Sequence, residues 1–218
     1  MRSIFPRREQ AYISELFGVD DSNALSVHSS APDGLHMVQL GVAEGQLLQF
    51  LIRAARVKSV VEVGTCVGFS AICMAMALPP EGHVYTIEKR DKVAPIAKRN
   101  IEKCAMTDKI TVLCGDALDK LKDLKSASPF DMMFIDANKS GYCDYLDWAE
   151  ANIKKGGLIV ADNVFLFGTV FSDTPPEKVS KSAHTSMRNF NKRLSDKSNY
   201  LASIIPTEEG MLVAIKLR

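Results

Sequence analysis

The chain has 218 residues, of which 27 are Lys or Arg and 26 are Asp or Glu, so its net charge is +1. This balance provides no overall electric field that would favour nucleic acid or a membrane surface. With 46% hydrophobic and 24% charged residues and no apolar run of membrane-spanning length, the chain has the composition of a soluble globular protein. We therefore expect one domain over residues 1–218, with residues 1–34 as an N-terminal extension, no membrane partner and a cytoplasmic location.

The first half of the chain alternates helical patterns with short β-branched runs. We expect helices over residues 7–16, 42–55, 70–78, 91–104 and 118–124, strands over 60–63, 84–88 and 109–114, and a loop over 26–34. The five cysteines of the whole chain include no Cys-x-x-Cys pair, which favours reduced thiols over disulfides or zinc.

The second half continues the alternation of strands and helices and then ends in a polar loop, a basic helix and two strand-like runs. Strands are expected over residues 130–136 and 158–161, a helix over 142–153, a polar loop over 165–186 and a basic helix over 181–197. Two strand-like runs, 200–205 and 211–217, then predict an antiparallel hairpin at a sheet edge. The whole pattern predicts an α/β fold with a doubly wound, mostly parallel sheet and this antiparallel C-terminal hairpin.

One stretch organises the rest, residues 59–70, which read Ser-Val-Val-Glu-Val-Gly-Thr-Cys-Val-Gly-Phe-Ser. A strand, a glycine turn and a helix bring a nucleotide-like cofactor against bare backbone and a helix N-terminus. Cys66 and Ser70 stand where the dinucleotide fingerprint has its second and third glycines, which favours a cofactor without a pyrophosphate. An ordinary βα connection is the alternative.

Two carboxylates accompany this turn. Glu62 lies inside the strand, where a carboxylate is costly unless it is paired or binds something polar. Glu88 ends the next strand, 20 residues past Gly68, where an acid can accept both hydroxyls of a ribose. A solvated carboxylate at a strand end is the alternative for Glu88.

Further acids follow the later strands. Asp116, Asp136 and Asp162 come at or just after predicted strand ends, as Glu88 does. Because ligands of doubly wound sheets bind at the carboxyl ends of the strands, we expect these four acids along one rim.

Asp136, Asp162 and Asn163 offer two carboxylates and an amide, which suit a hard divalent cation such as Mg²⁺, Mn²⁺ or Ca²⁺ and not zinc. A helix cap for Asp136 and an Asx turn at Asp162 are the alternatives. Lys139 follows Asp136 by three residues. Near a cation and partly desolvated, its pKa would fall, so that it could act as a base; a surface lysine is the alternative.

The ordered motifs together carry a family resemblance. Val-Glu-Val-Gly-Thr-Cys-Val-Gly-Phe-Ser is followed by Ile-Glu at 87–88, Gly-Asp-Ala at 115–117, Phe-Ile-Asp-Ala-Asn-Lys at 134–139 and Ala-Asp-Asn-Val at 161–164, and is preceded by Ala-Glu-Gly-Gln-Leu-Leu at 43–48. This set resembles the cation-dependent class I O-methyltransferases of the catechol and caffeoyl-CoA type, over about residues 35–170 and the closing hairpin.

The resemblance implies a Rossmann-like methyltransferase fold, S-adenosylmethionine as cofactor and a divalent cation. It implies the following residues: Leu40, Glu62, Gly64, Thr65, Ser70, Glu88, Asp116, Ala117 and Asp136 for the cofactor, Asp136, Asp162 and Asn163 for the metal, and Lys139 with Asp136 for catalysis. The implied substrate is a small hydroxylated aromatic molecule with vicinal oxygens. The cation would orient and acidify one hydroxyl, Lys139 would take the proton, and the oxyanion would attack the sulfonium methyl.

Two positions depart from the family pattern. Asn138 stands where the family often has an acid, and Val-Phe-Leu-Phe-Gly follows Asn163 where a tryptophan is frequent. Of the properties that the resemblance implies, the shape of the substrate is therefore the one least carried over from the family to this chain.

Three alternatives remain at this point: the same chemistry on a hydroxylated tRNA base, a nicotinamide-dependent oxidoreductase, and a non-catalytic binding module. Arg7, Arg8 and the basic helix over 181–197 could contact phosphate, although the neutral net charge makes a nucleic acid partner the less favoured one. We also expect a homodimer, because Met37-Val38 and Phe165-Leu166-Phe167 add apolar surface beyond one core. The alternative is that these residues line the substrate pocket.

Overall fold

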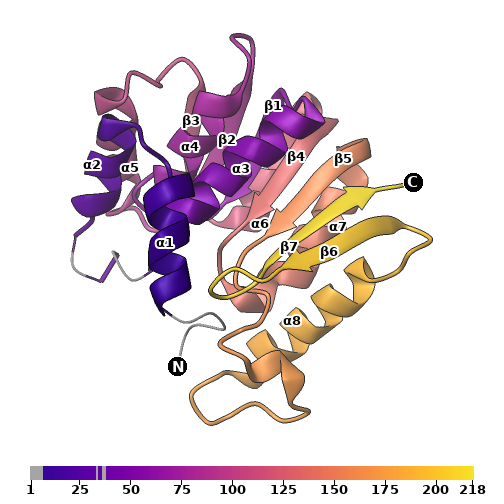
Figure 1. Ribbon diagram of the computed structural model, residues 1–218. Coiled ribbons are helices and arrows are strands. Elements are labelled where there is room, and N and C mark those ends of the chain that lie inside the picture. The colour runs from indigo at the N-terminus through magenta and orange to yellow at the C-terminus, as the bar shows by residue number, and fades with distance from the viewer. Residues whose placement is uncertain (1–6, 33, 36–37) are drawn as a thin grey trace. The chain divides into compact units, whose positions relative to one another are not determined.

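The structure is a computed structural model that describes residues 7–32, 34–35 and 38–218. It comprises two compact units, called here the N-terminal unit (Arg7–Lys122) and the C-terminal unit (Asp123–Arg218), whose elements are labelled in Figure 1. The expectation of a single domain stays a prediction.

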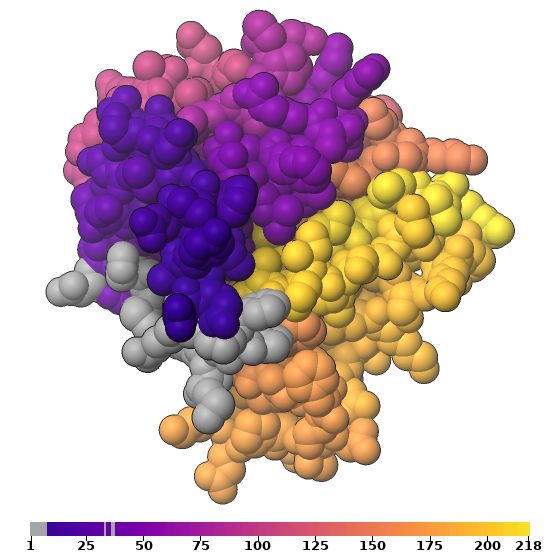
Figure 2. All heavy atoms as spheres, viewed as in Figure 1, coloured from indigo at the N-terminus to yellow at the C-terminus, as the bar shows by residue number. Residues whose placement is uncertain are grey.

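The N-terminal unit contains a three-stranded parallel sheet with the strand order β3-β2-β1. Its strands are β1 (Ser59–Val63), β2 (His83–Glu88) and β3 (Ile110–Cys114), and its helices are α1 (Arg7–Phe17), α2 (Ser22–Ser29), α3 (Val42–Ala55), α4 (Phe69–Ala77), α5 (Ala94–Lys103) and α6 (Ala117–Asp123). α1 lies at the surface of this unit, where Figure 2 shows it in indigo, and Tyr12, Leu16 and Phe17 on it are exposed.

The core of this unit forms around α4, which leads out of the glycine turn. All residues of α4 except Met76 are buried, and so are the valines of β1. α3 approaches α4 closely at Gly45, where a Cβ atom would lie 3.0 Å from the Cys73 sulfur. This packing holds α4, the helix that follows the turn, against α3.

One prediction for the N-terminal unit is wrong. The loop expected over residues 26–34 begins only after α2, which continues to Ser29. The helix forms because the Asp21 carboxylate accepts hydrogen bonds from the backbone N–H groups of Asn23 and Ala24, at 3.0 and 2.9 Å. This N-cap satisfies donors that the first turn of a helix leaves unpaired.

The C-terminal unit contains a four-stranded mixed sheet with the order β4-β5-β7-β6. β4 and β5 are parallel, and the pairs β5–β7 and β7–β6 are antiparallel, which confirms the predicted C-terminal hairpin. Its strands are β4 (Phe130–Ile135), β5 (Ile153–Ala161), β6 (Tyr200–Ile205) and β7 (Met211–Lys216), and its helices are α7 (Tyr142–Asn152) and α8 (Lys181–Leu194), with short 3-10 helices η2 (Leu124–Ala127), η3 (Lys139–Gly141) and η4 (Thr169–Phe171).

Strand β5 begins earlier than predicted, at Ile153 rather than Leu158. Phe130 pairs with Ile153 and Met132 with Leu158, so the residues between the two pairs on β5 bulge out of the ladder. Gly156 lies in this bulge at φ 78°, a conformation that favours glycine. The predicted polar loop after Asn163 also contains η4 and ends where α8 begins at Lys181.

The fold class is confirmed, because the seven strands form a mixed α/β architecture that is parallel apart from its C-terminal strands. In the part of the chain that the structure describes, none of the helices has the length and apolar character needed to cross a bilayer.

Candidate active site

The glycine turn of the N-terminal unit holds its backbone in left-handed conformations. Gly64 and Gly68 have φ values of 107° and 91°, and Cys66 between them adopts 49°. The backbone N–H groups of Gly64 and Thr65 both donate to the Ile87 carbonyl, at 3.0 and 3.3 Å. These two N–H groups are therefore used within the sheet.

Glu62 is fully buried in β1, as expected for a carboxylate that has a partner. The Ser70 hydroxyl donates to its Oε1 at 2.5 Å from the first turn of α4. The Thr65 hydroxyl instead pairs with the Thr86 hydroxyl at 2.6 Å, so the side chain of Thr65 is part of the sheet core. The structure therefore brings Glu62 and Ser70 together, while Thr65 offers only backbone.

Glu88 is bound to the same turn from the end of β2. Its Oε2 accepts from the Cys66 N–H at 2.8 Å, and its Oε1 accepts from the Arg90 backbone and side chain at 3.0 and 2.9 Å. The residue is 4% exposed. A carboxylate offers about four acceptor positions, so Glu88 keeps acceptor capacity beyond these three bonds.

Asp116 lies next to Glu88 across the sheet, because the Gly115 N–H donates to the Glu88 carbonyl at 2.9 Å. Its carboxylate accepts from Lys89 Nζ at 3.2 Å and from the Leu118 N–H at 3.0 Å. The hydrogen bond from Lys89 is the main reason that the pKa of Asp116 lies below its usual value. Ala117 opens α6, and both Ala117 and Leu40 are buried.

The C-terminal unit carries the second group of predicted residues. Asp136 and Asp162 directly follow β4 and β5, and the last residues of these strands, Ile135 and Ala161, pair in parallel register. The Asp162 N–H donates to the Ile135 carbonyl at 3.0 Å. The prediction that these two acids come from adjacent strand ends is confirmed. Glu88 with Asp116 and Asp136 with Asp162 thus form one pair in each unit, and a common rim for all four stays a prediction.

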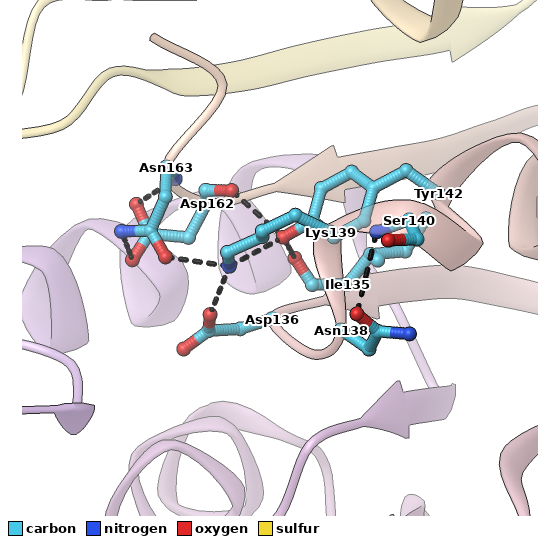
Figure 3. Close-up of polar contacts among 8 residues, drawn as sticks. All are labelled: Ile135, Asp136, Asn138, Lys139, Ser140, Tyr142, Asp162 and Asn163. Carbon is cyan, nitrogen blue, oxygen red and sulfur yellow. Dashed lines mark hydrogen bonds and ion pairs between the residues drawn. The ribbon is translucent and has the colours of Figure 1, made fainter. Parts of the chain in front are cut away.

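Lys139 connects these residues, as Figure 3 shows. Its Nζ donates to Asp136 Oδ1 at 2.9 Å, to Asn163 Oδ1 at 2.6 Å and to the Tyr142 hydroxyl at 2.8 Å. The side chains of Lys139 and Asp136 are only 19% and 17% exposed. A surface lysine is therefore excluded.

The expected lowering of the Lys139 pKa supposes a cation beside it and stays a prediction; the groups of the chain itself act in the opposite direction. Burial lowers the pKa of Lys139, but the contact with the Tyr142 hydroxyl and the negative charges of Asp136 and Asp162 raise it by more, so the pKa lies above its usual value. The ammonium form is the one that these groups stabilise.

Tyr142 is a site residue that the sequence analysis missed. It is fully buried at the start of α7, and its hydroxyl contacts the carbonyls of Asp162 and Ile135 at 2.9 and 3.3 Å. The hydroxyl thus donates to the strand ends and accepts from Lys139. Burial raises the pKa of Tyr142, so it remains a neutral hydroxyl. The available signal was its spacing, three residues after Lys139.

Asn163 bridges Asp162 and Lys139 from a left-handed backbone conformation, φ 56°. Its backbone N–H and its Nδ2 donate to the two Asp162 oxygens at 2.8 and 3.1 Å, while its Oδ1 faces Lys139. Asn138, unlike Asn163, makes no hydrogen bond with Lys139 in the part of the chain that the structure describes. Its side chain caps η3 by accepting a hydrogen bond from the Ser140 N–H at 3.4 Å (Figure 3). The caps of η3 and α7 are Asn138 and Gly141, so Asp136 caps neither helix.

The donor chemistry of this group fits a hard divalent cation. Among the described residues, no cluster of three or more His, Cys, Asp or Glu side chains that could hold a metal occurs. The candidate set is instead two carboxylates and one amide, and the oxygens of Asp136 and Asn163 already converge on one cationic nitrogen. Oxygen donors of this kind are those that Mg²⁺ and Mn²⁺ bind.

Comparison with known proteins decides the family. The model of the family described as O-methyltransferase matches residues 21–217. The chain belongs to the O-methyltransferase family. It is 36% identical over 212 residues to a catechol O-methyltransferase of Niastella koreensis, covering 94% of both chains. It is also 28% identical over 172 residues to a caffeoyl-CoA O-methyltransferase of Stellaria longipes, covering 77% of this chain and 67% of that protein.

Solved structures agree with this family assignment. The O-methyltransferase TomG from Streptomyces achromogenes, in complex with SAM, matches 98% of this chain and all of its own, with 28% identity and a TM-score of 0.85. An O-methyltransferase from Bacillus cereus in complex with SAH matches 96% of this chain and 97% of its own, with 28% identity and the same TM-score. The prediction of an O-methyltransferase enzyme with a Rossmann-like fold is confirmed, and the oxidoreductase and the non-catalytic module are set aside.

Proposed function

We propose that this member of the family uses S-adenosylmethionine and a divalent cation to methylate one of two vicinal hydroxyls on a small aromatic molecule. The observation that carries the proposal is the convergence of Asp136 and Asn163 oxygens on one cationic nitrogen, beside a second strand-end carboxylate, Asp162. Support also comes from the relative named catechol O-methyltransferase, which the chain matches over nearly its full length.

The N-terminal unit would hold S-adenosylmethionine, which supplies an electrophilic methyl group when bound. Carbonyl oxygens of the glycine turn and the buried Glu62–Ser70 pair suit its amino-acid end, because an ammonium needs acceptors. Glu88, fixed to the turn by Cys66 N–H, would accept from the ribose hydroxyls. The remaining proposed contacts are Leu40, Gly64, Thr65, Asp116 and Ala117, and a cofactor contact of Asp136 stays a prediction.

The C-terminal unit would hold the cation through Asp136, Asp162 and Asn163. A bound divalent cation supplies Lewis-acid polarisation of the substrate hydroxyls. Lys139 would accept the hydroxyl proton at Nζ as a neutral amine. Because Asp136 stabilises its ammonium form here, the lysine would first have to move away from that carboxylate and release a proton to solvent. Tyr142 would hold the lysine side chain during that change through its hydroxyl.

An aromatic acceptor is supported by the segment that follows Asn163. Phe165 and Phe171 lie with their ring centroids 5.5 Å apart, and Phe167 and Phe171 are 50% and 72% exposed. Leu166 and Phe167 have φ values of 46° and 57°, uncommon for such residues. Backbone strain of this kind concentrates at functional sites, so we assign this segment to the recognition of an aromatic ring.

The acceptor is tested by a pair of isomers. Transfer of a labelled methyl group from S-adenosylmethionine should occur with catechol, whose hydroxyls are vicinal, and be at least about tenfold slower with resorcinol, whose hydroxyls cannot chelate one ion. Equal rates with both isomers would contradict a chelated substrate. Faster transfer to hydroxylated than to unmodified tRNA, with no transfer to catechol, would replace the proposal by the nucleic acid alternative.

The contacts of α8 give little support to a nucleic acid partner. Arg188 pairs with Asp173 at 2.9 Å, and Arg193 pairs with Asp147 and Glu150 at 2.7 and 2.9 Å. These cations are already neutralised by acids of the same unit. The side chain of Arg7 and the whole of Met37 lie outside the described residues.

We also propose a homodimer and a cytoplasmic location. Of the residues first predicted to form the interface, Val38 and Phe167 are 56% and 50% exposed, whereas Leu166 is buried. On α1, Tyr12, Leu16 and Phe17 add further exposed apolar side chains in the N-terminal unit. Light scattering at micromolar concentration should give twice the chain mass. The five free cysteines fit a reducing compartment.

A further inference from the structure

We propose that Lys139 is a built-in counter-cation: its ammonium occupies the oxygens of the proposed metal site and must be released from them when a divalent ion binds. The inference rests on the proposed function, because it concerns the cation site formed by Asp136, Asp162 and Asn163. It goes further by assigning the same lysine a role in metal affinity and in the stability of the metal-free protein.

The contacts of the ammonium carry this inference. Nζ lies 2.9 Å from Asp136 Oδ1 and 2.6 Å from Asn163 Oδ1, and both oxygens belong to proposed metal ligands. The Asn163 amide is turned so that its oxygen faces Lys139 and its nitrogen faces Asp162 (Figure 3). The site is thus arranged around a positive charge supplied by the chain itself.

A positive charge is required at this place. Asp136 and Asp162 follow adjacent parallel strands and are both shielded from solvent, so their carboxylates repel unless a cation or proton lies near them. In the metal-free protein, Lys139 provides that charge. A divalent ion would take the place of two hydrogen bonds that Lys139 makes. The ammonium of Lys139 would repel this ion for as long as the ammonium remained in the site.

The surroundings of Lys139 allow it to leave without unfolding. Tyr142 offers it a hydroxyl at 2.8 Å and a ring whose centroid lies 5.0 Å from Nζ, and neither belongs to the metal ligands. The backbone of η3, which Lys139 opens, is fixed by the Asn138 cap and by a contact of 3.2 Å between the Ser140 and Ser182 hydroxyls. Exchange of the two cations therefore needs only a movement of the lysine side chain.

The direct test compares metal binding by Lys139→Gln with that of the wild type. Glutamine removes the charge but keeps hydrogen-bonding groups. Lys154→Gln is the matched control, because Lys154 pairs with the poorly exposed Asp131 at 2.6 Å in the same unit, away from the proposed ligands. Titration calorimetry with Mn²⁺, without S-adenosylmethionine or substrate, should show binding to Lys139→Gln at least about tenfold tighter than to wild type and to Lys154→Gln.

Thermal unfolding gives a second readout that does not depend on activity. Without metal, Lys139→Gln should have a Tm several degrees below that of the wild type, and Mn²⁺ should raise the Tm of Lys139→Gln by more than that of the wild type. Lys139→Arg keeps the charge and should bind Mn²⁺ no tighter than the wild type does.

The outcomes separate this inference from the proposed function. If wild type binds Mn²⁺ and Lys139→Gln binds it equally or more weakly, the counter-cation role is wrong while the metal site stands. Tighter binding by Lys139→Arg as well would also overturn the role, since the charge would not be the cause. Absence of Mn²⁺ binding in the wild type and in every variant would overturn both the metal site and the inference.

Discussion

The Tyr142 hydroxyl lies 2.8 Å from the Lys139 ammonium, and it donates a hydrogen bond of 2.9 Å to the Asp162 carbonyl. A single buried oxygen therefore joins the lysine to the end of β5. Because Tyr142 is fully buried, no water can take over its role if the hydroxyl is removed. Tyr142 is thus a positioning residue for Lys139.

Replacing Tyr142 with phenylalanine should reveal this role. Lys139 would lose one acceptor and the Asp162 carbonyl one donor, which should lower the free energy of unfolding by about 1–3 kcal/mol. The exposed Tyr12→Phe is the control and should change it by less than about 0.5 kcal/mol. Urea unfolding measures both. The rate of methyl transfer should also fall in Tyr142→Phe, while its affinity for S-adenosylhomocysteine should be unchanged. If neither the rate nor the urea midpoint of unfolding changed, Tyr142 would not be a positioning residue for Lys139.

Ser70→Ala tests the buried Glu62 carboxylate. The Ser70 hydroxyl donates to Glu62 at 2.5 Å, and its loss from a fully buried acid should lower the free energy of unfolding by about 1–3 kcal/mol. Ser29→Ala, which removes an exposed hydroxyl bonded to a helix carbonyl, should have little effect. Binding of S-adenosylhomocysteine should weaken only in Ser70→Ala. Equal stability of the two variants would show that this hydrogen bond contributes nothing.

Alanine substitutions at two glycines distinguish an effect on backbone strain from an effect on cofactor binding. Gly68 and Gly156 have φ values of 91° and 78°, so alanine at either position should cost about 1–2 kcal/mol of stability. No atom lies within 4 Å of a Cβ at Gly156, and the nearest to one at Gly68 is the Ala97 carbonyl oxygen at 3.5 Å. Calorimetry with S-adenosylhomocysteine should show reduced affinity for Gly68→Ala and unchanged affinity for Gly156→Ala. Reduced affinity in both would indicate a global effect.

His83 gives a pH dependence of stability. Burial lowers the pKa of His83, whose ring contacts the Thr111 hydroxyl at 2.8 Å. The unfolded chain therefore binds this proton more readily than the folded one. The neutral ring contributes stability above the unfolded pKa of about 6.5, and this contribution is lost as the pH falls through the lower, folded pKa. His83→Asn should make the free energy of unfolding fall less steeply as the pH drops from about 6.5 towards the folded pKa. An unchanged slope in this pH range would contradict this.

The sequence predicted the parts of the fold that depend on local composition. β-branched runs identified β1, β2 and β3, and an apolar run of Phe, Met and Ile residues identified β4. Their order with the helices indicated the α/β architecture. The sequence did not predict features that depend on a single side chain or on one long-range pairing. α2 was missed because it depends on the cap by Asp21. The start of β5 was misplaced because the pairing of Ile153 with Phe130 determines it.

The candidate site was predictable as a set of residues but not as a network. Asp136, Lys139 and Asn163 were identified from type and spacing, yet their hydrogen bonds depend on rotamers that tertiary packing selects. Tyr142 was missed because a buried aromatic residue at the start of a helix is typical of the core. The raised pKa of Lys139 likewise follows from the charges that the fold gathers around it.

The most direct measurement follows methyl transfer to catechol by wild type and Asp162→Ala, each with Mg²⁺ and with excess EDTA. Calorimetry with S-adenosylhomocysteine on the same samples reports whether the cofactor site is intact. We predict methyl transfer by the wild type with Mg²⁺, no transfer in EDTA, and no transfer by Asp162→Ala. The affinity of Asp162→Ala for S-adenosylhomocysteine should stay within about threefold of the wild-type affinity, because the contacts proposed for this ligand lie mainly in the N-terminal unit. Full activity in EDTA, with Asp162→Ala as active as wild type, would contradict the proposed cation-dependent mechanism.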